Sequence, residues 1–326
     1  MRISATLALP LLFLLQTSLL AQERIRIAWA GGTPESSPIW VVQEKGLLKK
    51  QGVDAEIISI SNSPTALQAL LAGELDVIVT SVTTLVNSRL SGADVVMILG
   101  MVPTFPDYIV ALPSVTSVEQ LKGKIGAVNR LGTTSDLGLR IALRKMGIDP
   151  EKDVKLIAVG DGAARFAALS KGVVQFTTLN EPLVAMAEKS GFRSVAHVTS
   201  LKIPFWYNAV LSREATIKAK RLLLIKFCKA MTEAVHFIKT QKEATKAIFS
   251  KNVKIKDAES LERAYRDFAS IFPETLYPTP EGVKTLLDDL APRNPKAAAA
   301  DPKSFVDISL VQEVEATGFT RQLYKR

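Results

Sequence analysis

The residues best suited to binding chemistry lie in short segments where a hydrophobic run gives way to a helical pattern. The richest is 129–135, which contains an arginine, a glycine and three hydroxyl side chains. Backbone N–H groups at a helix start, together with hydroxyls, hold an anion or a carbonyl oxygen. An arginine can bind a carboxylate or sulfonate through two parallel hydrogen bonds. The alternative is a surface arginine beside an ordinary capped helix. The candidate contacts in this segment are Arg130, Gly132, Thr133 and Thr134.

Two earlier segments have a similar composition. Residues 31–38 (GGTPESSP) separate the first strand pattern from the first helical pattern, and residues 81–83 (SVT) follow a continuous apolar run. Glycine allows close backbone approach to a solute, whereas hydroxyls at a helix start can also serve only as caps. A nearby tryptophan could form a flat wall of the site or pack in the interior. The candidate contacts here are Gly32, Thr33, Ser37, Trp40, Ser81 and Thr83.

Acidic and aromatic side chains follow later strand patterns. Asp161 lies between two glycines, and Glu181 lies between an asparagine and a proline. Acidic groups in a site favour a solute with an amine or several N–H donors over a bare anion, although Asp161 can instead cap the next helix. The aromatic segments 105–108 and 205–207 could stack on a planar solute or pack a hinge. They add Asp107 and Trp206 to the candidates.

No catalytic or metal-binding motif accompanies these segments. The two histidines, His197 and His236, have no neighbouring His or Cys at ligand spacing. The sequence contains neither a Gly-x-Ser-x-Gly elbow nor a Gly-x-x-x-x-Gly-Lys loop. We therefore expect a binding protein without a cofactor rather than an enzyme.

The elements that position these segments alternate between strand and helix up to about residue 211. Strand patterns occur at 25–29, 55–60, 75–79, 95–99, 124–128, 154–159 and 173–178. Helical patterns occur at 38–50, 63–71, 82–90, 134–146 and 163–170. Such alternation predicts an α/β protein with parallel sheets covered on both faces.

The remainder of the chain is helical, and the α/β part contains a short internal repeat, which we call the echo. Helices are expected at 214–240, 242–249, 257–272, 280–290 and 310–317, with a surface loop at 291–302. The pattern Ala-Leu-x-x-Gly-x-apolar-polar occurs at 69–76 and again at 168–175. The echo predicts two similar lobes whose strand ends face a common cleft.

The N-terminus indicates export. Arg2 is followed by the apolar run 7–15 and by a small residue, Ala21, at the expected cleavage site. The run is shorter than the about 20 residues that span a bilayer; a buried N-terminal helix is the alternative. The single cysteine, Cys228, allows no intrachain disulfide and provides no lipid anchor. We expect a signal peptide at 1–21 and a periplasmic location.

The charge does not indicate nucleic acid. The 326 residues carry a formal net charge of +9 at pH 7, which alone would suggest nucleic acid or an acidic membrane. The basic residues, however, are scattered over helical segments without interleaved aromatic side chains. Solvated helix faces account for them, and we expect no nucleic-acid partner.

Several phrases occur in an order typical of one family. They are 25–53 (IRIAWAGG to KKQGV), 69–76 (ALLAGELD), 118–127 (VEQLKGKIGA) and 309–319. In this order they resemble substrate-binding proteins of the nitrate/sulfonate/taurine ABC transporters, the SsuA/THI5-like group. The resemblance spans nearly the whole chain after the expected signal peptide. Gln175 departs from the aspartate usual at the second copy of the echo.

The resemblance implies a type II periplasmic binding protein fold: two α/β lobes joined by two crossing strands, with the helical C-terminal part packed on lobe one. It places the crossings near 108–112 and 205–211. Lobe one would then comprise 24–108 plus 209–326, and lobe two 109–208.

The resemblance also implies a function. It implies a solute-binding receptor of an ABC importer that closes around a sulfonate, nitrate, carboxylate or heteroaromatic solute. The implied partners are the importer's permease and ATPase, and we expect a monomer. Two alternatives remain: an enzyme on the same fold, of the pyrimidine or menaquinone-precursor biosynthesis type, and a periplasmic ligand sensor. The sequence leaves the identity of the solute open.

Overall fold

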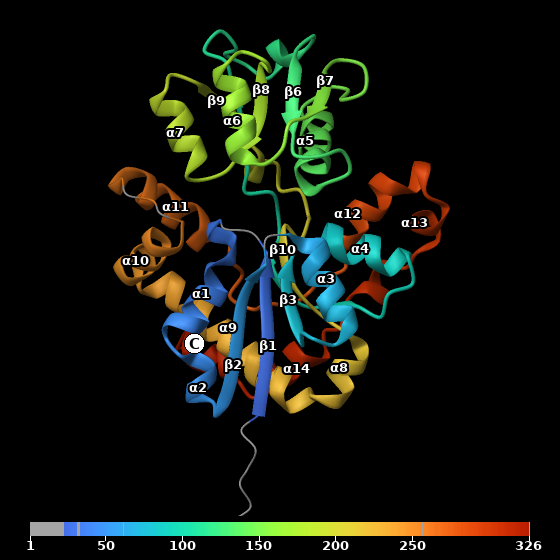
Figure 1. Ribbon diagram of the computed structural model, residues 1–326, viewed down its shortest axis with the longest axis vertical. Coiled ribbons are helices and arrows are strands. Elements are labelled where there is room, and N and C mark those ends of the chain that lie inside the picture. The colour runs from blue at the N-terminus through green and yellow to red at the C-terminus, as the bar shows by residue number, and fades with distance from the viewer. Residues whose placement is uncertain (1–22, 31–32, 61, 254, 256, 326) are drawn as a thin grey trace, which may run out of the picture.

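Two five-stranded sheets, each covered by helices, form two lobes (Figure 1). The computed structural model describes residues 23–30, 33–60, 62–253, 255 and 257–325. We call the sheet built mainly from the N-terminal part, with its helices, lobe one, and the second sheet, with its helices, lobe two. The expected periplasmic-binding-protein architecture is confirmed at this level.

The sheet of lobe one has the strand order β2-β1-β3-β10-β4. Its strands are β1 (Glu23–Ala30), β2 (Val53–Ile60), β3 (Val77–Thr80), β4 (Val96–Val102) and β10 (Asn208–Ser212). Strand β1 runs parallel to β2 and β3, whereas β10 runs antiparallel to β3 and β4. The returning chain therefore inserts between two strands of the first lobe.

The sheet of lobe two has the order β7-β6-β8-β5-β9. Its strands are β5 (Tyr108–Ala111), β6 (Ile125–Val128), β7 (Lys155–Ala158), β8 (Phe176–Leu179) and β9 (Arg193–His197). Strand β6 is parallel to β7 and β8, and β5 is antiparallel to β8 and β9. Both sheets are thus mixed rather than purely parallel as expected. In each, an antiparallel strand follows a crossing of the chain between the lobes.

The helices divide between the lobes as follows. Lobe one carries α1 (Ser37–Glu44), α2 (Leu47–Lys50), α3 (Ser63–Ala72), α4 (Val82–Leu90), α8 (Glu214–Ala219), α9 (Arg221–Thr240), α10 (Lys242–Val253), α11 (Ala258–Ile271), α12 (Glu281–Leu290), α13 (Pro295–Ala299), α14 (Ser309–Ala316) and α15 (Phe319–Leu323). Lobe two carries α5 (Thr134–Lys145), α6 (Gly162–Ser170) and α7 (Leu183–Lys189). The 3₁₀ turns are η1 (Pro34–Ser36), η2 (Glu119–Leu121), η3 (Val198–Leu201), η4 (Ala291–Arg293) and η5 (Pro302–Phe305).

Several helical segments differ from the sequence expectation. The single helix expected at 38–50 is split into α1 and α2 at Gly46, whose φ of 59° is in the left-handed region. The helix expected at 214–240 is split into α8 and α9 at Lys220. The loop expected at 291–302 contains η4 and α13, which begins after Asn294 caps it.

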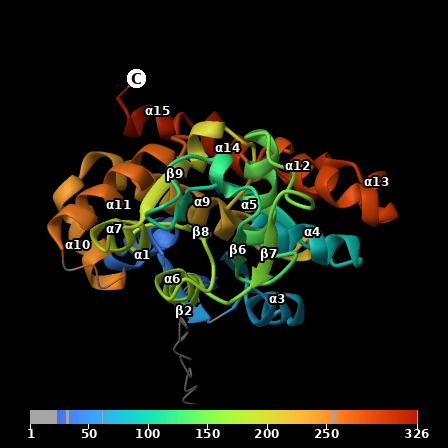
Figure 2. The same ribbon diagram turned by 90° about the horizontal axis from the view of Figure 1, so that it is seen from above.

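The helices that follow β10 arch around lobe one, from α10 and α11 at one end to α12 and α13 at the other (Figure 2). Helix α9 is central to this packing, because it contacts α1, α2 and α14 and buries Leu224, Phe227, Met231 and Val235 at helical spacing. No helix in the described ranges combines the length and hydropathy needed to cross a bilayer.

The apolar core continues from one lobe to the other through the two chain crossings that contain Phe105 and Phe205, which we call the waist. One cluster of buried side chains includes Ala28 and Ile78 of lobe one, Phe105 and Phe205 at the waist, and Leu143 of α5. The rings of Phe105 and Phe205 are stacked with their centroids 4.2 Å apart. This packing fixes the place at which the lobes meet and so positions the cleft beside it.

Candidate functional site

A cleft of about 670 Å³ opens between the lobes, where strand ends and helix starts of both lobes meet. Its polar lining from lobe one comprises Thr33, Asn62, Ser63, Ser81, Thr83 and Asn87. Its polar lining from lobe two comprises Asn129, Arg130, Thr133, Thr134, Ser135, Asp161, Arg165 and Asn180, and Tyr207 adds its ring from the second crossing. The hydroxyls and amides outnumber the charged groups, so the cleft suits a solute held by many hydrogen bonds.

Helices α3, α4, α5 and α6 are among those that begin at this cleft, and of these four α4 and α5 lack side-chain caps. Asn62 caps α3 by accepting from the Thr65 N–H at 3.0 Å, and Asp161 caps α6 by accepting from the Ala164 N–H at 2.9 Å. The residues that precede α4 and α5, Ser81 and Thr133, make no side-chain cap hydrogen bond. Helix starts without side-chain caps offer N–H groups and a partial positive charge to an anion, although at α4 the Val82 N–H already donates to the Trp206 carbonyl at 3.0 Å.

The two uncapped helices belong to different lobes and touch across the cleft. The Thr83 hydroxyl of α4 lies 3.0 Å from the Thr134 hydroxyl of α5. Each hydroxyl is in the first turn of its helix. A solute held at this point would contact both lobes at once.

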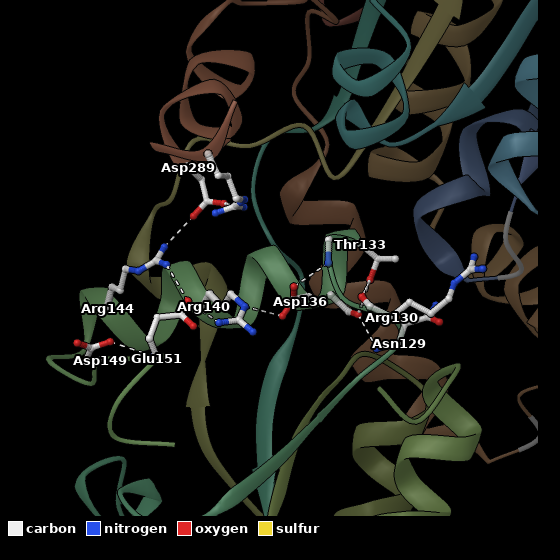
Figure 3. Close-up of polar contacts among 12 residues, drawn as sticks. Asn129, Arg130, Thr133, Asp136, Arg140, Arg144, Asp149, Glu151 and Asp289 are labelled. Carbon is white, nitrogen blue, oxygen red and sulfur yellow. Dashed lines mark hydrogen bonds and ion pairs between the residues drawn. The ribbon is translucent and has the colours of Figure 1, made fainter. Parts of the chain in front are cut away.

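The loop before α5 is held in shape by its own hydrogen bonds. Ser135 Oγ accepts from the Asn129 N–H at 2.9 Å, and the Gly132 N–H donates to Asp136 Oδ2 at 2.8 Å. Gly132 has a φ of 78°, which favours glycine. Asp136 is in turn fixed by Arg140 at 2.7 Å (Figure 3). The loop therefore has a defined shape before any solute arrives.

Arg130 extends from this loop away from the Asp136–Arg140 pair (Figure 3). Its side chain is exposed, lines the cleft and forms no ion pair with a residue that the structure describes. A guanidinium without a protein counter-charge is available to an acidic group of a solute.

Arg165 is a second cation at the cleft, and it is only 7% exposed. Its two terminal nitrogens donate to the carbonyls of Gly160 at 2.9 Å and Thr178 at 3.1 Å. Its Nε is buried and has no hydrogen-bond partner within the described chain. Burial lowers the pKa of Arg165, and Asp107 opposes that effect. A buried N–H without a partner is costly, so a solute acceptor at this place would be favourable.

Buried acidic groups lie behind this part of the cleft. Burial raises the pKa of Asp107 to about 7, with Glu35 acting in the same direction and Arg165 opposing it. Glu35 accepts from the Thr33 hydroxyl, and burial raises its pKa as well. Burial, and to a smaller extent the same two carboxyls, raise the pKa of Tyr207. Asp107 is buried and does not line the cleft itself.

The cleft brings together eight of the residues predicted from the sequence: Thr33, Ser81, Thr83, Arg130, Gly132, Thr133, Thr134 and Asp161. Asp161 also performs the capping role that was its alternative. Gly32 lies outside the described residues. Sequence reasoning did not select Arg165, Asn180 or Tyr207. Asn180 and Tyr207 belong to segments that were singled out, whereas nothing in the alanine-rich stretch around Arg165 signals a ligand.

Two predicted residues lie in the interior of lobe one. Trp40 is almost fully buried and packs edge-on against Trp29 at 5.7 Å and Phe249 at 6.5 Å between ring centroids. Ser37 is buried at the start of α1. Neither residue lines the cleft. Trp40 thus takes the packing role that was its alternative.

Trp206 and Glu181 lie close to the cleft but face other parts of the protein. Trp206 donates from Nε1 to the Thr279 carbonyl at 2.8 Å, and it fills the space where a Cβ on Gly100 or Gly282 would lie. Glu181 is 1% exposed and lies 2.6 Å from Arg263 Nε of α11. Burial raises the pKa of Glu181 to about 7, and Arg263 opposes that effect.

The sequence matches one family over most of its described length. Residues 33–245 match the family described as NMT1/THI5 like. YtlA of Bacillus subtilis (strain 168), which is named as a binding protein, is 26% identical over 224 residues, or 65% of this chain and 66% of YtlA. A protein of Brucella abortus (strain 2308), also named as a binding protein, is 31% identical over 167 residues, or 51% of each chain. The chain spans about half to two thirds of the length of these relatives.

Solved structures share the fold. The periplasmic aliphatic sulphonate binding protein SsuA from Escherichia coli has a TM-score of 0.69 at 21% identity, covering 88% of this chain and 91% of SsuA. The periplasmic nitrate-binding protein NrtA from Synechocystis PCC 6803 has a TM-score of 0.72 at 14% identity, covering 91% of this chain and 89% of NrtA. This likeness shows the periplasmic-binding-protein fold, and the match over residues 33–245 confirms the family resemblance. The chain is a member of the NMT1/THI5-like family.

Proposed function

We propose that this protein is the exported solute-binding receptor of an ABC importer and that it binds a small polar solute in the cleft between its lobes. The observation that carries the proposal is a cleft lined by hydrogen-bonding groups from both lobes. The proposal includes a signal peptide at 1–21, a periplasmic location, lobe one at 24–108 plus 209–326 and lobe two at 109–208. Its partners are a permease and an ATPase, and it acts as a monomer.

The mechanism follows from the two-sided lining. A solute that bonds to the starts of both α4 and α5 makes all of its contacts only when the lobes are closed. It therefore shifts the population toward the closed form by its difference in affinity for the two forms. The permease then recognises the closed form rather than the solute itself.

We infer that the solute carries an acidic group, such as a carboxylate or a sulfonate. Support comes from the uncapped starts of α4 and α5, the free guanidinium of Arg130 and the unpartnered Nε of Arg165. The acidic residues that favoured an amine have other roles: Asp161 caps α6, and Glu181 pairs with Arg263. SsuA, the structural neighbour with 21% identity, is named for aliphatic sulphonates.

The enzyme alternative has less support from the cleft. Neither histidine nor cysteine is among the described residues that line it. Cys228 is buried within α9, and His197 stacks on Tyr108 with ring centroids 4.0 Å apart. The serine and threonine hydroxyls at the cleft therefore have no histidine base among the described lining residues, and a hydroxyl nucleophile needs an adjacent base for activation.

The test is a thermal-shift screen of the protein against alkanesulfonates, taurine, nitrate, aromatic carboxylates and pyrimidines. We expect at least one acid to raise Tm and to lower the radius of gyration in solution scattering. Arg130→Gln should weaken binding of that acid by about 10- to 100-fold, because a charge-assisted hydrogen bond is lost. Lys152→Gln, on the exposed surface of lobe two, is the matched control and should leave the affinity unchanged.

Two results would count against the proposal in different ways. If no compound in the panel stabilises or compacts the protein, the receptor function itself is contradicted. If only neutral or cationic pyrimidines do so, and Arg130→Gln leaves their binding intact, the acidic solute is wrong but the receptor function stands.

A further inference from the structure

The lobes also meet away from the cleft, where α7 of lobe two lies next to α11 of lobe one (Figure 1). Arg263 of α11 is the centre of this contact. Its Nε lies 2.6 Å from Glu181 Oε1, as an ion pair rather than an aligned hydrogen bond. Its Nη1 donates to Glu188 Oε2, and its guanidinium lies 5.4 Å from the centroid of the Tyr108 ring. All three partners belong to the lobe defined by the second sheet, in which Tyr108 is the first residue of β5.

The burial of this group distinguishes it from ordinary surface ion pairs. Glu181 is 1% exposed and Arg263 is 19% exposed. Exposed pairs contribute little, but removing one partner of a buried pair leaves a charge without compensation. Glu181 also accepts weakly from the Ala185 N–H at 3.4 Å, and that contact stays within lobe two. The charge compensation of Glu181 therefore depends on a residue of the other lobe.

Further contacts extend the same interface. Tyr108 donates to Asp267 Oδ2 at 2.9 Å, and Lys189 lies 2.8 Å from Asp257 Oδ2. At the opposite end of the cleft, Arg144 of α5 pairs with Asp289 of α12 at 2.7 Å (Figure 3). The lobes are thus joined by polar contacts at both ends of the cleft, and the Arg263 group is the most buried of them.

We propose that Arg263, with Glu181 and Glu188, is a latch that holds the two lobes in the closed arrangement. The proposal rests on the proposed hinge motion and goes beyond it, because it assigns part of the closing free energy to groups that do not touch the solute. Opening the lobes must separate Arg263 from both carboxylates and expose Glu181 to water. The latch therefore raises the closed fraction before any solute binds, and the apparent affinity for the solute rises with that fraction.

The test is solution scattering of the solute-free protein. Arg263→Met removes the latch, and we expect a larger radius of gyration than that of the wild type. Lys246→Met is the matched control: Lys246 is 17% exposed and pairs with Glu243 and Glu262, both within lobe one. This variant loses a similarly buried cation but no contact between the lobes, so its radius of gyration should equal that of the wild type.

A second variant distinguishes loss of the latch from local misfolding. Because Arg263→Met leaves Glu181 buried without its counter-charge, the variant could lose structure locally and expand for that reason. Arg263→Met/Glu181→Gln removes both charges, so it should retain a cooperative thermal transition and still show the larger radius of gyration. Arg263→Lys should give an intermediate radius, because an ammonium cannot match both carboxylates with the same fork of donors.

The scattering of the solute-free variants tests the latch independently of the solute screen. If the cooperatively folded double variant has the same radius of gyration as the wild type, the latch is overturned, whatever the solute screen gives. If the double variant is larger than both the wild type and Lys246→Met, the latch is supported. A screen in which no compound binds contradicts the receptor function instead, and the scattering of the solute-free variants remains decisive for the latch.

Discussion

At the scale of single residues, the buried carboxyl of Asp107 makes stability depend on pH. Burial raises its folded-state pKa to about 7 from an ordinary value of 3.8. The folded protein then keeps a proton that the unfolded chain releases above about pH 4, so a rise in pH favours unfolding. We expect the contribution of Asp107 to the free energy of unfolding to fall by about 3 kcal/mol between pH 5 and pH 8. Urea unfolding of the wild type and of Asp107→Asn at pH 5 and pH 8 measures this change in the free energy of unfolding.

The variant provides its own reference in this experiment. Asp107→Asn cannot titrate, so its stability relative to the wild type should be higher at pH 8 than at pH 5. Glu35 lies nearby and its pKa is raised by burial, so Glu35→Gln should change the pH dependence in the same direction. A difference between wild type and Asp107→Asn that is equal at both pH values would contradict the raised pKa.

The sequence located the residues of the cleft only where local chain order determines them. Ser81, Thr83 and the segment 129–135 follow strands and begin helices, and that order alone places them at the strand ends. The positions of Glu181 and Arg165 depend on partners in other elements. Glu181 pairs with Arg263 of α11, and Arg165 donates to the carbonyl of Thr178. No local pattern contains that information.

At the scale of elements, the packing of α5 against the waist requires a glycine. A Cβ at Gly138 would lie 2.6 Å from the ring of Phe105. Gly138→Ala should therefore destabilise the protein by about 1 to 3 kcal/mol through overpacking. This loss outweighs the gain of up to about 1 kcal/mol that alanine offers in a helix. Urea unfolding of the variant and the wild type measures the change.

A smaller side chain at position 105 should reverse the sign of this effect. In a Phe105→Leu background the ring is absent, so Gly138→Ala should become neutral or stabilising through helix propensity. If Gly138→Ala is equally destabilising in both backgrounds, the close approach to Phe105 is not its cause.

Most elements could be predicted because their patterns are local, and the exceptions have physical reasons. Helix α4 has the predicted bounds, since an apolar strand and Ser81 precede it and Ser91 and Gly92 follow it. The directions of β5 and β10 could not be derived from periodicity, because an alternating apolar pattern is the same in parallel and antiparallel strands. The break at Gly46 did have a signal, a glycine within the helical pattern.

At the scale of the whole molecule, the continuous apolar cluster joins two lobes that must also move. The cluster runs from Ala28 in lobe one through Phe105 and Phe205 to Leu143 in lobe two. The polar contacts of Arg263 and Arg144 lie at the ends of the cleft and can separate at modest cost compared with the waist. We therefore expect the lobes to rotate about a waist that stays packed, while the polar contacts of Arg263 and Arg144 at the ends of the cleft separate.

The same continuity predicts that the lobes unfold together. All three tryptophans lie in lobe one or at the second crossing, so tryptophan fluorescence reports that part of the molecule, while circular dichroism at 222 nm reports the helices of both lobes. We expect the two signals to give the same urea midpoint for the wild type. Phe105→Ala removes the waist ring, should cost about 3 to 5 kcal/mol, and should separate the midpoints. Separate midpoints in the wild type would show that the waist does not couple the lobes.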